Sequence, residues 1–120
     1  MSDAFAQAYG RPSLTIVELI NQSYETAKAK GWWELPDFNV GEKIALMHSE
    51  LSEALECIRN REPDMQIVNG KPEGMTVELA DVIIRICDLA GHMNLPLEEA
   101  LRVKLAYNLT RPYRHGNKTC

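Results

Sequence analysis

The sequence has few cysteines, no long apolar run and no excess of basic residues, and each of these absences excludes a class of protein. Three widely spaced cysteines without a C-x-x-C pair give neither a disulfide framework nor a zinc knuckle, and they favour a reducing, cytoplasmic location. No apolar run has the length of a membrane-spanning helix, and the first residues lack the features of a signal peptide. The net charge of −4 predicts no general attraction to nucleic acid or to a membrane surface.

The sequence indicates a single all-α domain over residues 1–120, because this length is sufficient for one core and the periodic segments are helical. Helical spacing predicts four helices, at residues 14–30, 41–61, 76–92 and 97–109. Residues 1–12 carry no periodic signal and are expected to form a flexible arm, whereas residues 112–120 form a basic tail. The segment 60–74 is predicted to be a connection with a tight turn at Asn69-Gly70.

Capping signals support the first two helices. Thr15-x-x-Glu18 and Asn39-x-x-Glu42 each combine a preferred N-cap residue with an acid three positions later, which is the capping-box pattern. Gly31 is placed to end the first helix in the left-handed conformation that glycine adopts without strain. We therefore expect these helices to begin and end close to these residues.

The third predicted helix is largely apolar, and its polar residues recur at intervals of three and four. On a helix they fall within an arc of roughly 80°. We call this arc the charged stripe; it consists of Glu78, Asp81, Arg85, Asp88 and His92. Such a helix should be covered on most sides, and its stripe must face an ion pair, a metal or a cleft, because unpartnered buried charge is costly. Arg85 is expected to form a structural ion pair with Asp81 or Asp88, which is favoured over a contact with substrate.

The second predicted helix carries a similar acidic pair, Glu50 and Glu53, beside an apolar stripe. That apolar stripe consists of Ile44, Met47, Leu51, Ala54, Leu55 and Ile58. His48 falls on the same stripe, so a hydrogen-bonded core histidine is favoured over a metal ligand. Leu46 projects between the two glutamates, which suggests that this acidic face is covered as well.

If the second and third helices pack antiparallel, four carboxylates converge, those of Glu50, Glu53, Glu78 and Asp81. Their mutual repulsion would be relieved by a divalent cation, and an all-oxygen ligand set favours Mg²⁺, with Mn²⁺ as a substitute. A single E-x-x-E usually marks a solvated helix face, but the second pair lies on an otherwise apolar helix. A di-iron site is disfavoured because no E-x-x-H motif is in register.

The spacing E-x-x-E, 24 residues, E-x-x-D resembles that of the MazG-like all-α nucleoside triphosphate pyrophosphohydrolases. The segments EKIALMHSELSEALECIR and VELADVIIRICDLAG look like the two metal-binding helices of that family. K-x-x-Y-N-x-x-R followed by His-Gly looks like its C-terminal motif, and GWW before the second helix is similar to short members. The resemblance covers about residues 20–118 and identifies a short, single-domain MazG-like chain.

This resemblance implies a four-helix, bundle-like fold assembled as a homodimer that pairs into a tetramer. It also implies Mg²⁺-dependent cleavage of the α–β phosphate bond of (deoxy)nucleoside triphosphates, giving a monophosphate and pyrophosphate. Glu50, Glu53, Glu78 and Asp81 would hold the metal, and either Glu50 or Glu53 would orient or deprotonate the attacking water.

The expected substrate contacts come from the loop before the second helix and from the C-terminal region. Lys104 and Arg111 suit phosphate, and Asn108 suits a base or sugar edge. Tyr107 and one of the two tryptophans, Trp32 or Trp33, would stack on the base. His115 would contact phosphate or lie in a mobile tail.

Four alternatives accompany these assignments. The tryptophans could plug the core, and the C-terminal cations could simply be a solvated helix end. The chain could be a non-catalytic helical module that binds a nucleotide or a partner protein, which predicts binding without turnover. It could instead act on phosphoribosyl-ATP, which predicts selectivity for that nucleotide over free triphosphates.

Overall fold

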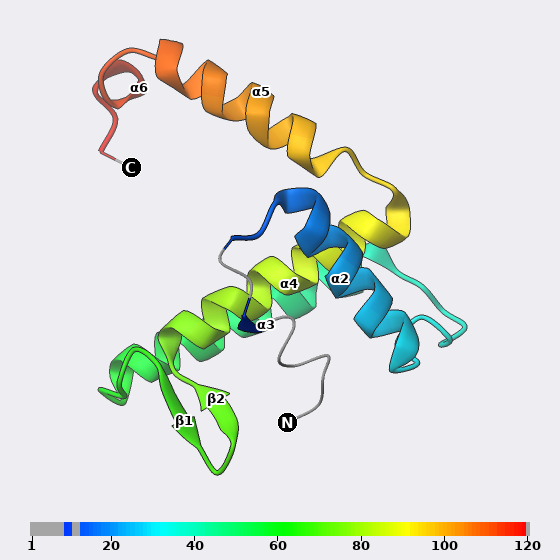
Figure 1. The fold of residues 1–120 in the computed structure, drawn as a ribbon. Coiled ribbons are helices and arrows are strands. Elements are labelled where there is room, and N and C mark those ends of the chain that lie inside the picture. Colours follow the sequence, from blue (N-terminus) through cyan, green and yellow to red (C-terminus); the bar gives the residue numbers. More distant parts are fainter. Residues whose placement is uncertain (1–8, 11–12, 120) are drawn as a thin grey trace.

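A computed structural model describes residues 9–10 and 13–119, without the side chain of His115. The predicted flexible arm at residues 1–12 therefore lies almost wholly outside the described residues. The main helices are α2 (Ile16–Ala29), α3 (Val40–Arg59), α4 (Met75–Met93) and α5 (Leu97–Thr110), followed by the short α6 (Arg114–Asn117). Figure 1 shows this mostly helical chain, which confirms the helical class and the four predicted helices to within about two residues at most ends.

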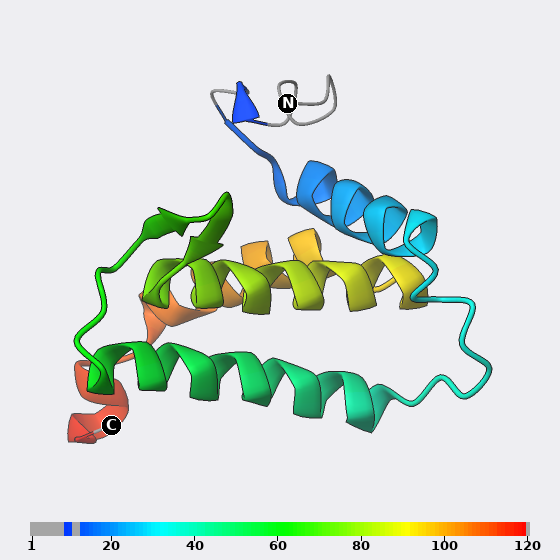
Figure 2. The same ribbon diagram turned by 90° about the horizontal axis from the view of Figure 1, so that it is seen from below.

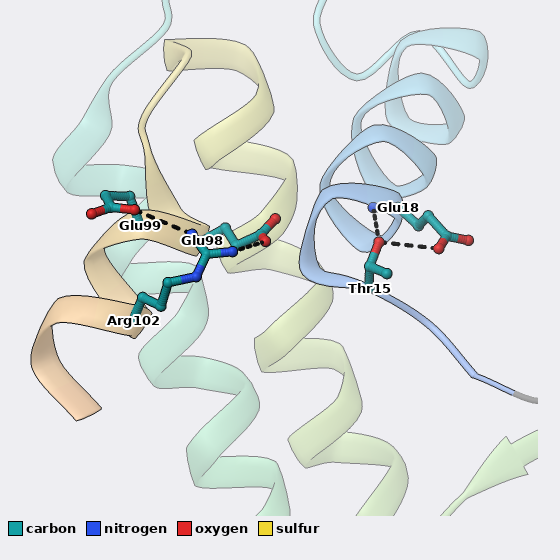
Figure 3. A network of polar contacts seen from close by, with 5 residues as sticks. All are labelled: Thr15, Glu18, Glu98, Glu99 and Arg102. Carbon is teal, nitrogen blue, oxygen red and sulfur yellow. Dashed lines mark hydrogen bonds and ion pairs between the residues drawn. The ribbon is translucent and has the colours of Figure 1, made fainter. Parts of the chain in front are cut away.

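Both capping predictions are confirmed. The Thr15 hydroxyl accepts a hydrogen bond from the backbone N–H of Glu18 at 3.1 Å, as Figure 3 shows, and the Asn39 side chain accepts one from the N–H of Glu42 at 3.0 Å. After α2, Gly31 adopts a φ of +85°. The N–H groups of Gly31 and Trp32 then bond to carbonyls of the last turn, which is the Schellman arrangement. These local signals therefore fix the path of the chain into and out of α2.

The connection at residues 60–74 contains a β-hairpin that the sequence analysis missed. Strands β1 (Gln66–Val68) and β2 (Lys71–Glu73) pair antiparallel around Asn69-Gly70. Both turn residues have positive φ, at +52° and +79°, as a two-residue type I′ hairpin requires. The predicted tight turn is confirmed, and the two short strands that it joins were not predicted.

Helix α4 lies between α2 and α3, and Figure 2 shows α3 and α4 running antiparallel side by side. At Gly91, a Cβ atom would lie 2.6 Å from the Cβ of Tyr24, so only glycine permits this close approach of α4 to α2. The described core is made of small or medium-sized residues: Ala54, Cys57, Cys87, Leu89 and Ala90. Both cysteines are thus buried core residues, as predicted.

A single chain leaves a large apolar surface uncovered. The predicted apolar stripe of α3 is largely exposed, including Ile44, Leu51, Leu55 and Ile58. His48 on this stripe is also exposed, so its prediction as a core histidine is wrong for the chain by itself. The buried residues of α3 are Ala54, which belongs to this stripe, and Cys57, which does not. Helix α4 likewise exposes Leu79, Ile83 and Ile84, although it was expected to be covered on most sides.

Helix α5 extends away from the other helices and makes few contacts with α2 (Figure 1). Its first turns are held by Arg102, which donates to the Glu98 carboxylate at 2.7 Å and to that of Glu99 at 3.2 Å (Figure 3). Residues 99–110 are all exposed, including Leu105 and Leu109. Among the described residues, no helix is both long and apolar enough to cross a membrane.

Candidate metal centre

Three of the four predicted metal ligands meet where α3 crosses the first half of α4. One carboxylate oxygen from each of Glu50, Glu78 and Asp81 lies within 4.8 Å of the others. Because α3 and α4 are antiparallel and each pair spans three residues, both acidic faces point into the same space. The fourth residue, Glu53, is more exposed and falls outside this trio, but it lines the same pocket.

Burial and neighbouring carboxylates strain this cluster electrostatically. Burial, then hydrogen bonding to Glu50 and Glu53, raises the pKa of Glu78 from 4.5 to about 7. Burial and the nearby Glu50 carboxylate also raise the pKa of Asp81, partly offset by Arg85 and Lys71. The Oε2 atom of Glu78 is buried without a hydrogen-bond donor among the described residues. The cluster therefore has more negative charge than the chain itself compensates.

Arg85 forms an ion pair, but with a partner on the opposite helix. Its Nε atom donates to the Oε1 oxygen of Glu50 at 3.1 Å, and its Nη2 atom lies 3.0 Å from the same oxygen as an ion pair. The prediction of Asp81 or Asp88 as the partner is wrong, because packing of α3 against α4 brings Glu50 within reach of the guanidinium. This pair links the two helices at the edge of the acidic cluster.

The acidic cluster opens into a pocket of about 380 Å³, which falls within the usual size range of small-molecule sites. The β-hairpin supplies one wall, through Lys71, Pro72 and Glu73. Gly74 joins this wall to α4, and its φ of +119° and the nearby Asp64 carbonyl leave no room for a side chain. We call this space the acidic pocket.

Several residues of the acidic pocket were not predicted as site residues. Lys71 is the pocket's cation, and Glu62 and Glu73 add further carboxylates from the connection. The Asn69-Gly70 turn was the sequence signal that could have placed Lys71 in the pocket, because a two-residue hairpin brings Lys71 back toward the start of α4. Glu62 and burial raise the pKa of the Cys57 thiol at the base of the pocket to about 11, so this cysteine stays protonated near neutral pH.

The donor set fits a hard divalent cation. All the converging atoms are carboxylate oxygens, which Mg²⁺ and Mn²⁺ accept, and no histidine or cysteine belongs to the trio. A cation would also give the buried Oε2 atom of Glu78 the partner that it lacks among the described residues.

The second half of α4 carries an aromatic cluster instead of a charge cluster. Trp33 stacks on His92 with ring centroids 3.7 Å apart and planes 4° apart, and it contacts Tyr24 and Phe38. Its indole N–H donates to the Asp88 carboxylate at 2.8 Å. Trp33 therefore packs as the core-plug interpretation expects.

Trp32 differs from its neighbour because 62% of its surface is exposed. It lines a recess of about 70 Å³ together with Trp33, Lys43 and His92. The Lys43 ammonium lies 4.7 Å from the centre of the Trp33 ring. Of the two tryptophans, Trp32 thus retains a free aromatic face.

Within one chain, the predicted substrate residues of α5 are not brought to the acidic pocket. Lys104 and Arg111 both lie over the Tyr107 ring, at 4.8 and 5.7 Å from its centre, so these three residues share one exposed face. Neither they nor Asn108 line the pocket. The side chain of His115 lies outside the described part of the structure. No protein-family model, curated protein or solved structure was found to match this chain.

Proposed function

We propose that this chain is a Mg²⁺-dependent nucleotide pyrophosphohydrolase, which splits canonical or modified (deoxy)nucleoside triphosphates into the monophosphate and pyrophosphate. The observation that carries this proposal is the convergence of Glu50, Glu78 and Asp81 beneath a pocket that can accept a polyphosphate. The resemblance of the two acidic helices to those of MazG-like enzymes supplies the reaction.

The polyanionic substrate explains why a cation is needed. Carboxylates by themselves would repel a triphosphate, so Glu50, Glu78 and Asp81 would act by holding Mg²⁺, with Mn²⁺ as a substitute. The bound ion would neutralise charge on the phosphate oxygens and lower the pKa of a coordinated water.

Glu53 is the residue we propose to orient the water and take its proton. It is more exposed than the trio, lines the acidic pocket and forms no ion pair with any described residue. Glu50 is less suited because it is already paired with Arg85, which donates a hydrogen bond to one of its oxygens. The proton lost by the water would pass to the Glu53 carboxylate, while the α–β bridging oxygen leaves with pyrophosphate.

Cations for the phosphate tail would come from two sources. Lys71 already lines the acidic pocket. Lys104 and Arg111 lie together on the detached α5, and a second copy of the chain could bring them to the pocket by charge complementarity. Tyr107 and Asn108 would arrive with them, and Trp32 offers an exposed ring for the base.

The same second copy would cover the uncovered apolar surface. Exposed apolar residues are concentrated on α3, α4 and α5. A monomer usually exposes such residues singly and scattered over its surface. We therefore propose an obligate homodimer, paired further into a tetramer, in which α5 completes a helical bundle with its partner.

Release of pyrophosphate tests the proposed reaction. Purified protein with Mg²⁺ should release pyrophosphate from a panel of natural and modified triphosphates. Glu53→Gln should stop turnover while leaving circular dichroism unchanged, and Glu25→Gln on the distant surface of α2 serves as the matched control. Orthophosphate release alone would refute the cleavage site. Binding without turnover would favour the non-catalytic helical module. Selective hydrolysis of phosphoribosyl-ATP would favour the alternative pyrophosphohydrolase activity.

Sedimentation tests the assembly separately. The wild type should sediment as a dimer or tetramer at micromolar concentration. Leu55→Glu, on the exposed stripe of α3, should shift it toward monomer, whereas Glu25→Gln should not. A stable wild-type monomer would overturn the proposed assembly.

A further inference from the structure

Arg85 is placed differently from the other arginines described on the helices. Arg59 and Arg102 pair with glutamates three or four residues away on their own helices, as exposed surface pairs do. Arg85 instead crosses from α4 to Glu50 on α3, which is one of the three converging carboxylates. It therefore competes for the same group that a metal ion would use.

The geometry of this pair leaves much of the guanidinium unused. Both of its contacts go to one oxygen, Glu50 Oε1, and not to the two oxygens of a fork-like pair. The Arg85 side chain is 41% exposed, whereas that of Glu50 is 13% exposed. Arg85 therefore contacts Glu50 from outside the residues that line the acidic pocket, and its more exposed side chain can leave this pair more easily than the glutamate can.

Charge balance gives the arginine a second partner. While Glu50 lacks a cation, Arg85 compensates its charge. If a divalent ion binds Glu50, Glu78 and Asp81, the guanidinium stands beside a dication and loses its carboxylate. An anion at the rim of the pocket would then be its favourable neighbour, and its planar N–H groups suit phosphate oxygens.

We propose that Arg85 exchanges partners, pairing with Glu50 before metal binds and contacting the substrate's phosphate chain once a divalent cation holds Glu50. This inference rests on the proposed function, because it assigns a polyphosphate to the acidic pocket. Arg85 lies one turn beyond Asp81 on the same face of α4, so a phosphate chain over the acidic cluster would lie within reach of its flexible side chain.

Metal binding without nucleotide tests the first half of the exchange. Mn²⁺ is titrated into the full-length wild type, Arg85→Gln, Arg85→Lys and the control Arg59→Gln, and bound ion is read by electron paramagnetic resonance. Arg85→Gln should bind Mn²⁺ more tightly, by about three- to tenfold, because no guanidinium competes for Glu50. Arg85→Lys and Arg59→Gln should stay close to wild type. A purely structural pair predicts weaker or unchanged binding in Arg85→Gln, which would overturn the proposal.

Polyphosphate binding tests the second half, and it needs no turnover and no knowledge of the base. Inorganic tripolyphosphate is titrated calorimetrically into each variant saturated with Mn²⁺. Arg85→Gln should bind it about tenfold more weakly than the wild type, Arg85→Lys should lose less affinity, and the control Arg59→Gln should bind it like the wild type. Equal affinity in Arg85→Gln and the wild type would refute the exchange. Failure of the wild type to release pyrophosphate would count against the proposed function alone, since both titrations still decide the role of Arg85.

Discussion

The two halves of the charged stripe on α4 have the same helical spacing but opposite surroundings. In the first half, Glu78 and Asp81 face another carboxylate, and burial raises the pKa of both. In the second half, burial raises the pKa of Asp88 as well, but this carboxylate accepts the Trp33 N–H, and His92 stacks on the Trp33 ring. The first half gathers more carboxylates than the arginine paired with Glu50 can balance, whereas the carboxylate of the second half is satisfied by the chain's own side chains.

This difference separates a site for chemistry from a site of packing. A buried polar group with a partner stabilises a unique arrangement, but an excess of one charge raises the free energy until a ligand arrives. Substitutions in the first half should therefore mainly lower activity, and substitutions in the second half should mainly lower stability.

The largest effect is expected on turnover in the first half of the stripe. Asp81→Asn should lower pyrophosphate release by at least about 100-fold, because a neutral amide is a poorer ligand for Mg²⁺. The same isosteric change in the second half, Asp88→Asn, should leave the rate within a few-fold of wild type. Equal losses in the two variants, measured by steady-state kinetics, would remove the distinction between the halves.

The next effect is on stability and separates the adjacent tryptophans. Trp33→Ala should lower the free energy of unfolding by about 2 kcal/mol or more, because it removes a ring packed on His92, Tyr24 and Phe38. Trp32→Ala should change it little, since that ring is mostly exposed. Urea denaturation measures both. A larger loss in Trp32→Ala would show that the aromatic cluster is assigned to the wrong tryptophan.

A third effect is the pH dependence of the metal-free protein. The folded-state pKa of Glu78 is raised from 4.5 to about 7, so folding favours its protonated form. This stabilisation is complete below pH 4.5 and is lost as the pH rises through about 7. Added Mg²⁺ should therefore raise the melting temperature more at pH 8 than at pH 5.5.

Glu78→Gln provides the control for that measurement. Its metal-free melting temperature should vary less with pH across this window, because the titrating carboxyl group is gone. If the melting temperature of the metal-free wild type rises as the pH increases from 4.5 to about 7, the raised pKa of Glu78 is contradicted.

The smallest effect concerns the hydrogen bond in the second half. Asp88→Ala should cost about 1–2 kcal/mol of stability, since it leaves the Trp33 N–H without its acceptor. Asp88→Asn keeps an acceptor oxygen and should cost less. Thermal unfolding of the two variants measures the difference, and equal costs would show that the bond contributes nothing measurable.

The sequence predicted local features well where the signal lies within a few residues. The capping boxes at Thr15 and Asn39 are confirmed, and so is the left-handed Gly31 after α2. Of the four carboxylates expected to converge, Glu50, Glu78 and Asp81 do so, whereas Glu53 is exposed and only lines the same pocket.

Features that depend on packing between distant residues were harder to predict. The partner of Arg85 depends on how α3 crosses α4, and helical spacing within α4 could not reveal Glu50. His48 lies on an apolar stripe that the single chain leaves exposed, so periodicity identified the stripe but not what covers it. Lys71 reaches the acidic pocket through the hairpin, whose strands are only three residues long.

The central claim is that the first half of the charged stripe holds a divalent cation. Anomalous diffraction from crystals soaked in Mn²⁺ tests it most directly. The account predicts a strong anomalous peak bounded by carboxylate oxygens of Glu50, Glu78 and Asp81, absent in Asp81→Asn and retained in Asp88→Asn. Ordered Mn²⁺ elsewhere, with these three carboxylates apart and without a peak between them, would contradict it.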